Sequence, residues 1–199
     1  MQHVAAVVLA AGASTRFGSP KALARLDGEP ILQLVLDAIR EAGIERIVVV
    51  LGHAADEIEE GIGWTDEVVV HNPDPRYLSS SLQVGLDAVA ALEPPPRAAL
   101  IALGDQPRTR PGVIRALLAA LRTTDRPVIV PIYADGGGPN PVLVRDDAFA
   151  LADEASGDHG LGPVLAERPE LVHEVAVTGT NPDVDTRADL DALRAAEPE

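Results

Sequence analysis

The chain has 199 residues, a length that suits one ordinary domain with a sizeable core, and 46% of its residues are apolar. It contains no cysteine, which excludes disulfides, thiol catalysis and zinc sites built on cysteine. Its formal net charge of −15 argues against a broad nucleic-acid surface, although a small nucleotide site needs only a few local cations.

The first part of the sequence alternates between apolar strands and helices. In chain order, the pattern predicts a strand over 3–10, a helix over 30–43, a strand over 46–52 and a short polar helix near 54–60. It continues with a strand over 66–72, a helix over 80–92 capped by one of its serines, a strand over 98–105, a helix near 111–122 and a strand over 127–133. Strands that are apolar at nearly every position, with helices between them, are typical of a parallel sheet covered on both faces.

The rhythm changes after Tyr133. Residues 134–149 predict a loop and a short strand, which could be antiparallel, and a helix near 160–167, a strand over 171–177 and a helix over 187–196 follow. The sequence therefore predicts an α/β fold of three layers, with a Rossmann-like, mostly parallel sheet and a small antiparallel element in the C-terminal half.

No internal repeat or long linker interrupts the pattern, so we expect a single domain over 1–199. The sequence holds no run of about 18 consecutive apolar residues, which argues against a membrane span. The N-terminus has no basic n-region, and a buried strand explains its apolar run better than a signal peptide does. Together these features favour a cytoplasmic protein that binds neither membranes nor nucleic acid.

The stretch VVLAAGASTRFGSPKAL, residues 7–23, follows the first predicted strand, where an open α/β sheet presents its ligand crevice. Gly12 and Gly18 permit a close backbone approach, and successive amides in such a loop can surround an anion. Arg16 and Lys21 add positive charge within reach of the same loop. The glycines match neither G-x-x-x-x-G-K-[S/T] nor G-x-G-x-x-G. An ordinary strand-to-helix connection is the alternative, but two glycines with two cations favour a phosphate-binding loop.

The same stretch resembles the signature of the nucleotidyltransferases, L-A-[A/G]-G-x-S-x-R-x-G-x-x-K, at every fixed position. The resemblance implies a loop that wraps the triphosphate of an incoming nucleotide, and a catalytic role for Arg16 and Lys21 in stabilising charge at the α-phosphate. It assigns nucleotide binding to Leu9, Ala10, Ala11, Gly12, Ser14 and Gly18.

Asp105, in the stretch ALGDQP, ends the strand predicted over 98–105, beside the same crevice. Hard oxygen ligands suit Mg²⁺, which would bridge substrate phosphates, so Asp105 is a candidate metal ligand. The alternative is an aspartate that caps the turn before Pro107. G-D-Q-P resembles the metal motif of the molybdopterin cytidylyltransferases and their near relatives.

The stretch NPDVDTRADL, residues 181–190, resembles the D-[I/V]-D-T-P-x-D-L motif of the same family, with arginine in place of the proline. The resemblance implies that an acidic group before the last helix completes the metal site, and it leaves Asp183 and Asp185 as candidates. The alternative is that Thr186 or Asp185 caps that helix.

The stretch HNPDPRYLSSSLQVGL, residues 71–86, resembles the family segment N-P-x-W-x-x-G-x-x-S-S-L, which lies over the nucleotide. The resemblance assigns nucleotide binding to Asn72, Ser80 and Ser81. The loop is one residue shorter here and lacks the glycine. Serines at a helix start are also ordinary caps, so that alternative stays open.

Two further segments match family elements that border an acceptor pocket. Asn140, in GGGPNPVLV, and Asp158, in SGDHGLGPVL, are the residues to which the resemblance assigns this role. The arginine that relatives carry in the second segment is replaced by Gly162. A loop histidine, His159, could act as a general base, but such residues are more often only solvated.

The motifs together imply a Mg²⁺-dependent nucleotidyltransferase that moves CMP from CTP to a phosphorylated acceptor such as molybdopterin and releases pyrophosphate. A handover contact with a molybdoenzyme or its chaperone is then expected. The alternatives are a sugar phosphate or another small phosphorylated alcohol as acceptor, and a non-catalytic nucleotide-binding regulator. We expect CTP over GTP, because a β-carbon at Ala11 narrows the space beside the base and restricts φ where guanylyl enzymes of this family carry glycine.

Overall fold

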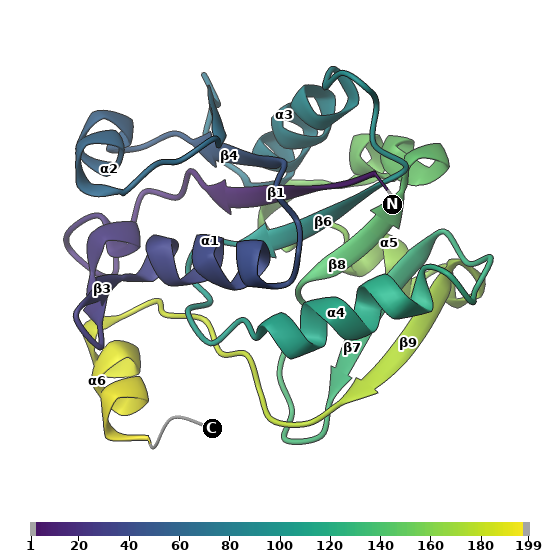
Figure 1. Ribbon diagram of the computed structural model, residues 1–199. Helices are drawn as coiled ribbons and strands as arrows, with labels where there is room; N and C mark the ends of the chain where they lie inside the picture. Colours follow the sequence, from purple (N-terminus) through teal and green to yellow (C-terminus); the bar gives the residue numbers. More distant parts are fainter. Residues whose placement is uncertain (1–2, 197–199) are drawn as a thin grey trace.

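Strands of the chain form a mixed sheet in the order β5-β4-β1-β6-β8-β7-β9 (Figure 1). The computed structural model describes residues 3–196. The strands are β1 (Val4–Ala10), β4 (Ile47–Leu51), β5 (Val68–His71), β6 (Ala98–Leu103), β7 (Val128–Tyr133), β8 (Val142–Arg145) and β9 (Val172–Val177). Only β8 runs antiparallel to its neighbours in this sheet, pairing with β6 and β7. The predicted α/β fold and its antiparallel C-terminal element are therefore confirmed.

Helices cover both faces of the sheet, and successive residues of β1 point to opposite faces. Val8 packs in one apolar cluster with Leu36 of α1 and Ile114 of α4, which lie together in front of the sheet in Figure 1. Val7 packs in the other cluster with Leu82 of α3. The helices are α1 (Ile31–Glu41), α2 (Ala55–Gly61), α3 (Leu78–Ala90), α4 (Pro111–Ala120), α5 (Gly162–Ala166) and α6 (Arg187–Ala195). This arrangement confirms the three predicted layers.

Several short elements were not predicted. A small hairpin pairs β2 (Arg25–Leu26) with β3 (Glu29–Pro30) before α1. The remaining elements are 3₁₀ turns: η1 (Lys21–Leu23), η2 (Asp146–Glu154), η3 (Gly157–His159) and η4 (Pro169–Leu171). Their apolar residues are too few to give the periodicity on which sequence prediction depends. The helix predicted near 160–167 is correspondingly shorter, since α5 covers only Gly162–Ala166.

The start of α3 differs from the sequence prediction. The helix begins at Leu78, and its N-cap residue is Tyr77, whose side chain makes no capping hydrogen bond. The prediction that a serine caps this helix was therefore wrong. Ser80 lies inside the first turn, and its hydroxyl donates back to the carbonyl oxygens of Asp74 and Tyr77 at 2.8 and 2.9 Å. The first amide of the helix is bound from outside, because Leu78 N donates to Asp158 Oδ1 at 3.3 Å.

A small third cluster holds the loop after β1 against the end of the chain. Phe17 packs with Leu26, with Val184 and with Leu190 of α6. Phe17 directly follows Arg16, and Val184 lies between Asp183 and Asp185. Burial of these apolar side chains therefore brings the cationic loop and the C-terminal carboxylates together.

Gly85 marks the closest approach of α3 to the sheet. A β-carbon there would overlap Val7 Cγ1 and would lie 3.0 Å from Val50 Cγ2. We expect Gly85→Ala to lower the free energy of unfolding in urea by about 1–3 kcal/mol, as overpacking does, despite alanine's better helix propensity. Gly112→Ala in α4 is the control, because a β-carbon there meets no described atom within 4 Å. An unchanged unfolding free energy for Gly85→Ala would contradict this packing.

None of the helices between residues 3 and 196 combines the length and the apolar character that crossing a membrane requires.

Candidate active site

Ser14 organises the loop after β1. Its backbone adopts the left-handed conformation, with φ 51°, and its carbonyl oxygen accepts from the amides of Phe17 and Gly18 at 3.0 Å each. Its hydroxyl accepts from Lys21 N at 3.1 Å. Gly18 has φ 81°, a conformation that side chains disfavour, so glycine is required at this turn. One serine thus fixes both the turn and the start of the segment that carries Lys21.

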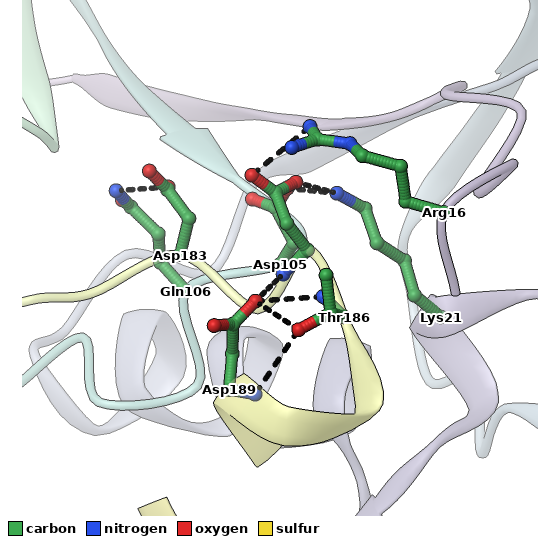
Figure 2. Close-up of polar contacts among 8 residues, drawn as sticks. Arg16, Lys21, Asp105, Gln106, Asp183, Thr186 and Asp189 are labelled. Carbon is green, nitrogen blue, oxygen red and sulfur yellow. Dashed lines mark hydrogen bonds and ion pairs between the residues drawn. The ribbon is translucent and has the colours of Figure 1, made fainter. Parts of the chain in front are cut away.

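The two cations of this loop meet carboxylates from distant segments (Figure 2). Lys21 Nζ forms an ion pair with Asp105 and lies 3.3 Å from Asp185 Oδ1. Arg16 Nη2 lies 3.1 Å from Asp185 Oδ2. Burial favours the neutral amine of Lys21, but the two carboxylates outweigh it and raise the pKa of Lys21 above its ordinary value. The ammonium form is therefore the one present at neutral pH.

Asp105 lies two residues beyond β6, which ends at Leu103 rather than at the predicted residue 105. Gly104 N donates to Leu9 O at 2.9 Å, and a β-carbon at Gly104 would lie 2.9 Å from the β-carbon of Ala10, so the chain passes tightly beside β1 there. Asp105 O in turn accepts from Val184 N at 2.9 Å. These backbone contacts fix Asp105 between the phosphate-loop candidate and the segment before α6.

The segment before α6 settles the capping alternative. Thr186 is the N-cap: its hydroxyl accepts from Asp189 N at 3.2 Å, while Asp189 Oδ2 accepts from Thr186 N at 2.7 Å. Thr186 and Asp189 thus form a capping box, which leaves the side chain of Asp185 available to Arg16 and Lys21. Asp183 Oδ1 accepts from Gln106 Nε2 at 2.8 Å. Burial, reinforced by the charge of Asp105, raises the pKa of Asp183 above its usual range.

The carboxylates of Asp105, Asp183 and Asp185 are suitable ligands for a divalent cation. Asp105 Oδ1 is buried and accepts no hydrogen bond within residues 3–196. A buried carboxylate oxygen without a partner is costly and is the kind of ligand that Mg²⁺ or Mn²⁺ takes. In the described chain, no three histidine, aspartate or glutamate side chains already form a metal cluster. Lys21 instead contacts Asp105 and Asp185, so a cation would replace its ammonium group there.

A cavity of about 770 Å³ opens over these groups. Most residues assigned from the sequence border it: Leu9, Ala10, Ala11, Gly12, Ser14, Arg16, Gly18, Lys21, Ser81, Asp105, Asp158, Asp183 and Asp185. Its border also includes residues that sequence reasoning missed, among them His53 and Tyr77. Their chemistry gives no sequence signal, since a lone histidine and a lone tyrosine in polar loops are common. His159 is not among the described residues that border the cavity.

Three assigned residues lie behind or away from this cavity within the described chain: Asn72, Ser80 and Asn140. Asn72 is buried, and its Nδ2 donates to Ser80 Oγ at 2.9 Å and to Ser81 Oγ at 3.0 Å. It therefore orients Ser81 rather than facing the cavity itself. The backbone oxygen of Asn140 accepts from Tyr133 OH at 2.8 Å.

Ala11 borders the cavity but is only 4% exposed. Its methyl group faces Gly52, where a β-carbon would lie only 2.9 Å from Ala11 Cβ. The main chain of Ala11 is fixed as well, because its carbonyl oxygen accepts from His53 N at 3.2 Å. An influence of Ala11 on base choice must therefore act mainly through the backbone position of the loop.

The sheet and this site define a class of α/β domain that presents a glycine loop with two cations at the carboxyl ends of its central parallel strands. Beside this loop lies the carboxylate cluster formed by Asp105, Asp183 and Asp185. The chain belongs to the family of MobA-like NTP transferase domains, whose sequence profile matches residues 6–175. This membership supports nucleotidyltransferase activity.

The chain is 38% identical over 192 residues to the bifunctional protein GlmU of Desulfitobacterium hafniense strain Y51, an alignment that covers 92% of this chain and 35% of GlmU. It thus spans about a third of the length of the curated relatives that it matches first. The crystal structure of Rv0371c from Mycobacterium tuberculosis H37Rv aligns with a TM-score of 0.85 at 31% identity, covering 98% of each chain.

A structure of Rv0371c in complex with manganese aligns with a TM-score of 0.80 at 30% identity, covering 98% of this chain and 100% of Rv0371c. A nucleotidyl transferase from Methanothermobacter thermautotroptrophicus aligns with a TM-score of 0.76 at 26% identity, covering 96% of each chain.

Proposed function

We propose that this protein is a Mg²⁺-dependent nucleotidyltransferase that moves CMP from CTP to molybdopterin, and that residues 1–199 fold as one domain. The observation that carries the proposal is the convergence of Arg16 and Lys21 with Asp105 and Asp185 at one edge of the cavity. Family membership supports the transfer reaction. The choice of CTP and of molybdopterin rests on the L-A-A-G and G-D-Q-P motifs, and a handover contact with a molybdoenzyme or its chaperone is part of the same proposal.

In the proposed reaction, a phosphate oxygen of the acceptor attacks the α-phosphorus of the nucleotide in line, the bond to the β-phosphate breaks, and pyrophosphate leaves. The amides of the loop from Gly12 to Arg16 hold the triphosphate, while those of Phe17 and Gly18 donate to Ser14 O and maintain the turn. Arg16 and Lys21 offset the negative charge that develops at the α-phosphate. Positioning and neutralisation supply the rate, because phosphoryl chemistry requires little covalent help from the protein.

Asp105, with Asp183 or Asp185, would hold the divalent cation. When bound, this cation supplies neutralisation of the phosphate oxygens. The residues of the chain must rearrange for it, since Lys21 contacts Asp105 and Asp185. Release of Lys21 from these carboxylates makes its charge available to the nucleotide.

The direct test is pyrophosphate release on mixing the protein with CTP, Mg²⁺ and molybdopterin, with the product identified by mass spectrometry. We expect pyrophosphate and a CMP-linked acceptor in equal amounts. A sugar phosphate in place of molybdopterin is the parallel assay for the alternative acceptor class. Tight CTP binding without transfer to any phosphorylated acceptor would favour a nucleotide-binding regulator and overturn the proposal.

The expected base choice is CTP over GTP. With equal CTP, GTP and ATP in competition, we expect cytidylyl transfer to give the main product. Ala11→Gly should narrow this preference, because glycine frees the loop backbone that Ala11 restricts. Gly63→Ala is a remote control, because a β-carbon at Gly63 would meet only Gln33 Oε1, at 3.4 Å. Guanylyl transfer as the main product would refute the cytidylyl assignment and leave nucleotidyl transfer itself standing.

A further inference from the structure

Two buried carboxamides form a hydrogen-bonded pair behind Asp183. Gln106 and Asn181 are each only 2% exposed, although they are 75 residues apart in the sequence. Gln106 Nε2 donates to Asp183 Oδ1 at 2.8 Å, and Gln106 Oε1 accepts from Asn181 Nδ2 at 3.0 Å. Figure 2 shows Gln106 reaching the carboxylate of Asp183 from the side away from Lys21.

The direction of both amides is fixed by their other partners. Asn181 Nδ2 also donates to the carbonyl oxygen of Asn140 at 3.3 Å, and this pure acceptor sets the direction of the Asn181 amide. The Thr109 hydroxyl lies 3.3 Å from Asn181 Nδ2 and 3.4 Å from Asn181 Oδ1, so it serves either direction. Gln106 Nε2 has a second acceptor in Asn181 O at 3.4 Å. A reversed Gln106 amide would turn its oxygen toward both Asp183 and the backbone oxygen of Asn181, which is repulsive. The network therefore presents a donor, not an acceptor, to Asp183.

We propose that Gln106, held in place by Asn181, is a positioning residue that fixes the Asp183 carboxylate for binding of the divalent cation. Gln106 donates a hydrogen bond to Asp183 Oδ1, which restricts rotation of the Asp183 carboxylate. Asp183 Oδ2 is then the oxygen that would bind the cation. Groups that hydrogen-bond metal ligands in this way typically change metal affinity by about 10–100-fold when removed. The inference deepens the proposed function, because it rests on the cation site proposed there and takes Asp183 as the ligand that binds beside Asp105.

The test measures binding of Mn²⁺ alone by electron paramagnetic resonance, with the full chain and without nucleotide or acceptor. We expect Gln106→Leu to weaken Mn²⁺ binding by about 10-fold or more. Thr109→Val is the matched control: it removes a hydroxyl from the same buried network, and that hydroxyl bonds to Asn181 rather than to Asp183. We expect it to leave Mn²⁺ affinity within about twofold of the original protein, and equal losses in both variants would overturn the positioning role.

Two double variants separate positioning from stability. Gln106→Leu with Asn181→Leu removes both amides together and also takes the partner of the buried Thr109 hydroxyl, so it should lower folding stability further while Mn²⁺ affinity stays near that of Gln106→Leu alone. In an Asp183→Ala background, Gln106→Leu should change Mn²⁺ affinity by less than about twofold, because its partner is already gone. A further large loss in that background would show that Gln106 acts by another route, and would overturn the inference.

Asp105→Asn separates this inference from the proposed function. If Asp105→Asn weakens Mn²⁺ binding and Gln106→Leu does not, the positioning role is wrong and the cation site stands. If neither substitution weakens Mn²⁺ binding, the cation lies elsewhere, and both the inference and the metal assignment fail. If Gln106→Leu weakens binding but no transfer to any acceptor is found, the inference stands and the proposed reaction fails.

Discussion

Asp105→Asn is expected to lower turnover in nucleotidyl transfer by about 10²-fold or more in saturating Mg²⁺, with the fold preserved. Asparagine keeps the shape of the side chain but removes its charge. Asp105 pairs with Lys21 and carries a buried oxygen that accepts no hydrogen bond within residues 3–196. Both observations support the proposed role of the charged Asp105 carboxylate as a metal ligand.

The measurement is initial-rate pyrophosphate release over a range of Mg²⁺ concentrations, with circular dichroism to verify the fold. Asp87→Asn is the control, because Asp87 is exposed on α3 and does not border the cavity. We expect its turnover to match that of the original protein. Turnover of Asp105→Asn near that of the original protein would rule out Asp105 as a metal ligand.

Lys21→Ala is expected to reduce turnover by about 10²–10³-fold, while nucleotide affinity falls by much less. The positive charge of Lys21 is needed most as the α-phosphate changes geometry. Loss of this charge therefore destabilises the transition state more than it weakens binding of the nucleotide. Turnover is measured by pyrophosphate release and affinity by calorimetry with CTP. A change confined to the Michaelis constant would make Lys21 a simple tether for the triphosphate.

Lys21 is the only lysine among the 16 lysine and arginine residues of the chain. Its compact ammonium group contacts two carboxylates, a geometry that the larger planar guanidinium of arginine does not reproduce. Lys21→Arg is therefore expected to lose turnover as well. Arg25→Ala is the control for loss of a cation, because Arg25 is exposed on β2 and outside the cavity border. Full turnover of Lys21→Arg would show that only the charge at this position matters.

The sequence predicted the sheet, its layers and the antiparallel C-terminal strand because these depend on the apolar pattern of each segment. It also placed Gly18 and Lys21 in a ligand-binding loop after the first strand, and the structure places both at the cavity. Such predictions work because local periodicity and turn chemistry are set by neighbouring residues. The start of α3 was misplaced because its first amide is bound by Asp158, which lies 80 residues away in the sequence.

The α/β fold, the cation-bearing loop and the candidate carboxylates Asp105, Asp183 and Asp185 thus follow from the apolar pattern and the motifs. The roles that the motifs left open depend on contacts between segments that are distant in the sequence. In the structure, Thr186 is the N-cap of α6, and Asp185 forms ion pairs with Arg16 and Lys21. Asn72 is buried and donates a hydrogen bond to Ser81. The structure also joins Gln106 to Asn181, a pair whose hydrogen bonds depend on amide direction. The hydrophobic pattern indicates which residues are buried. The direction of a buried polar group depends instead on its hydrogen-bond partners, which packing brings from distant parts of the chain.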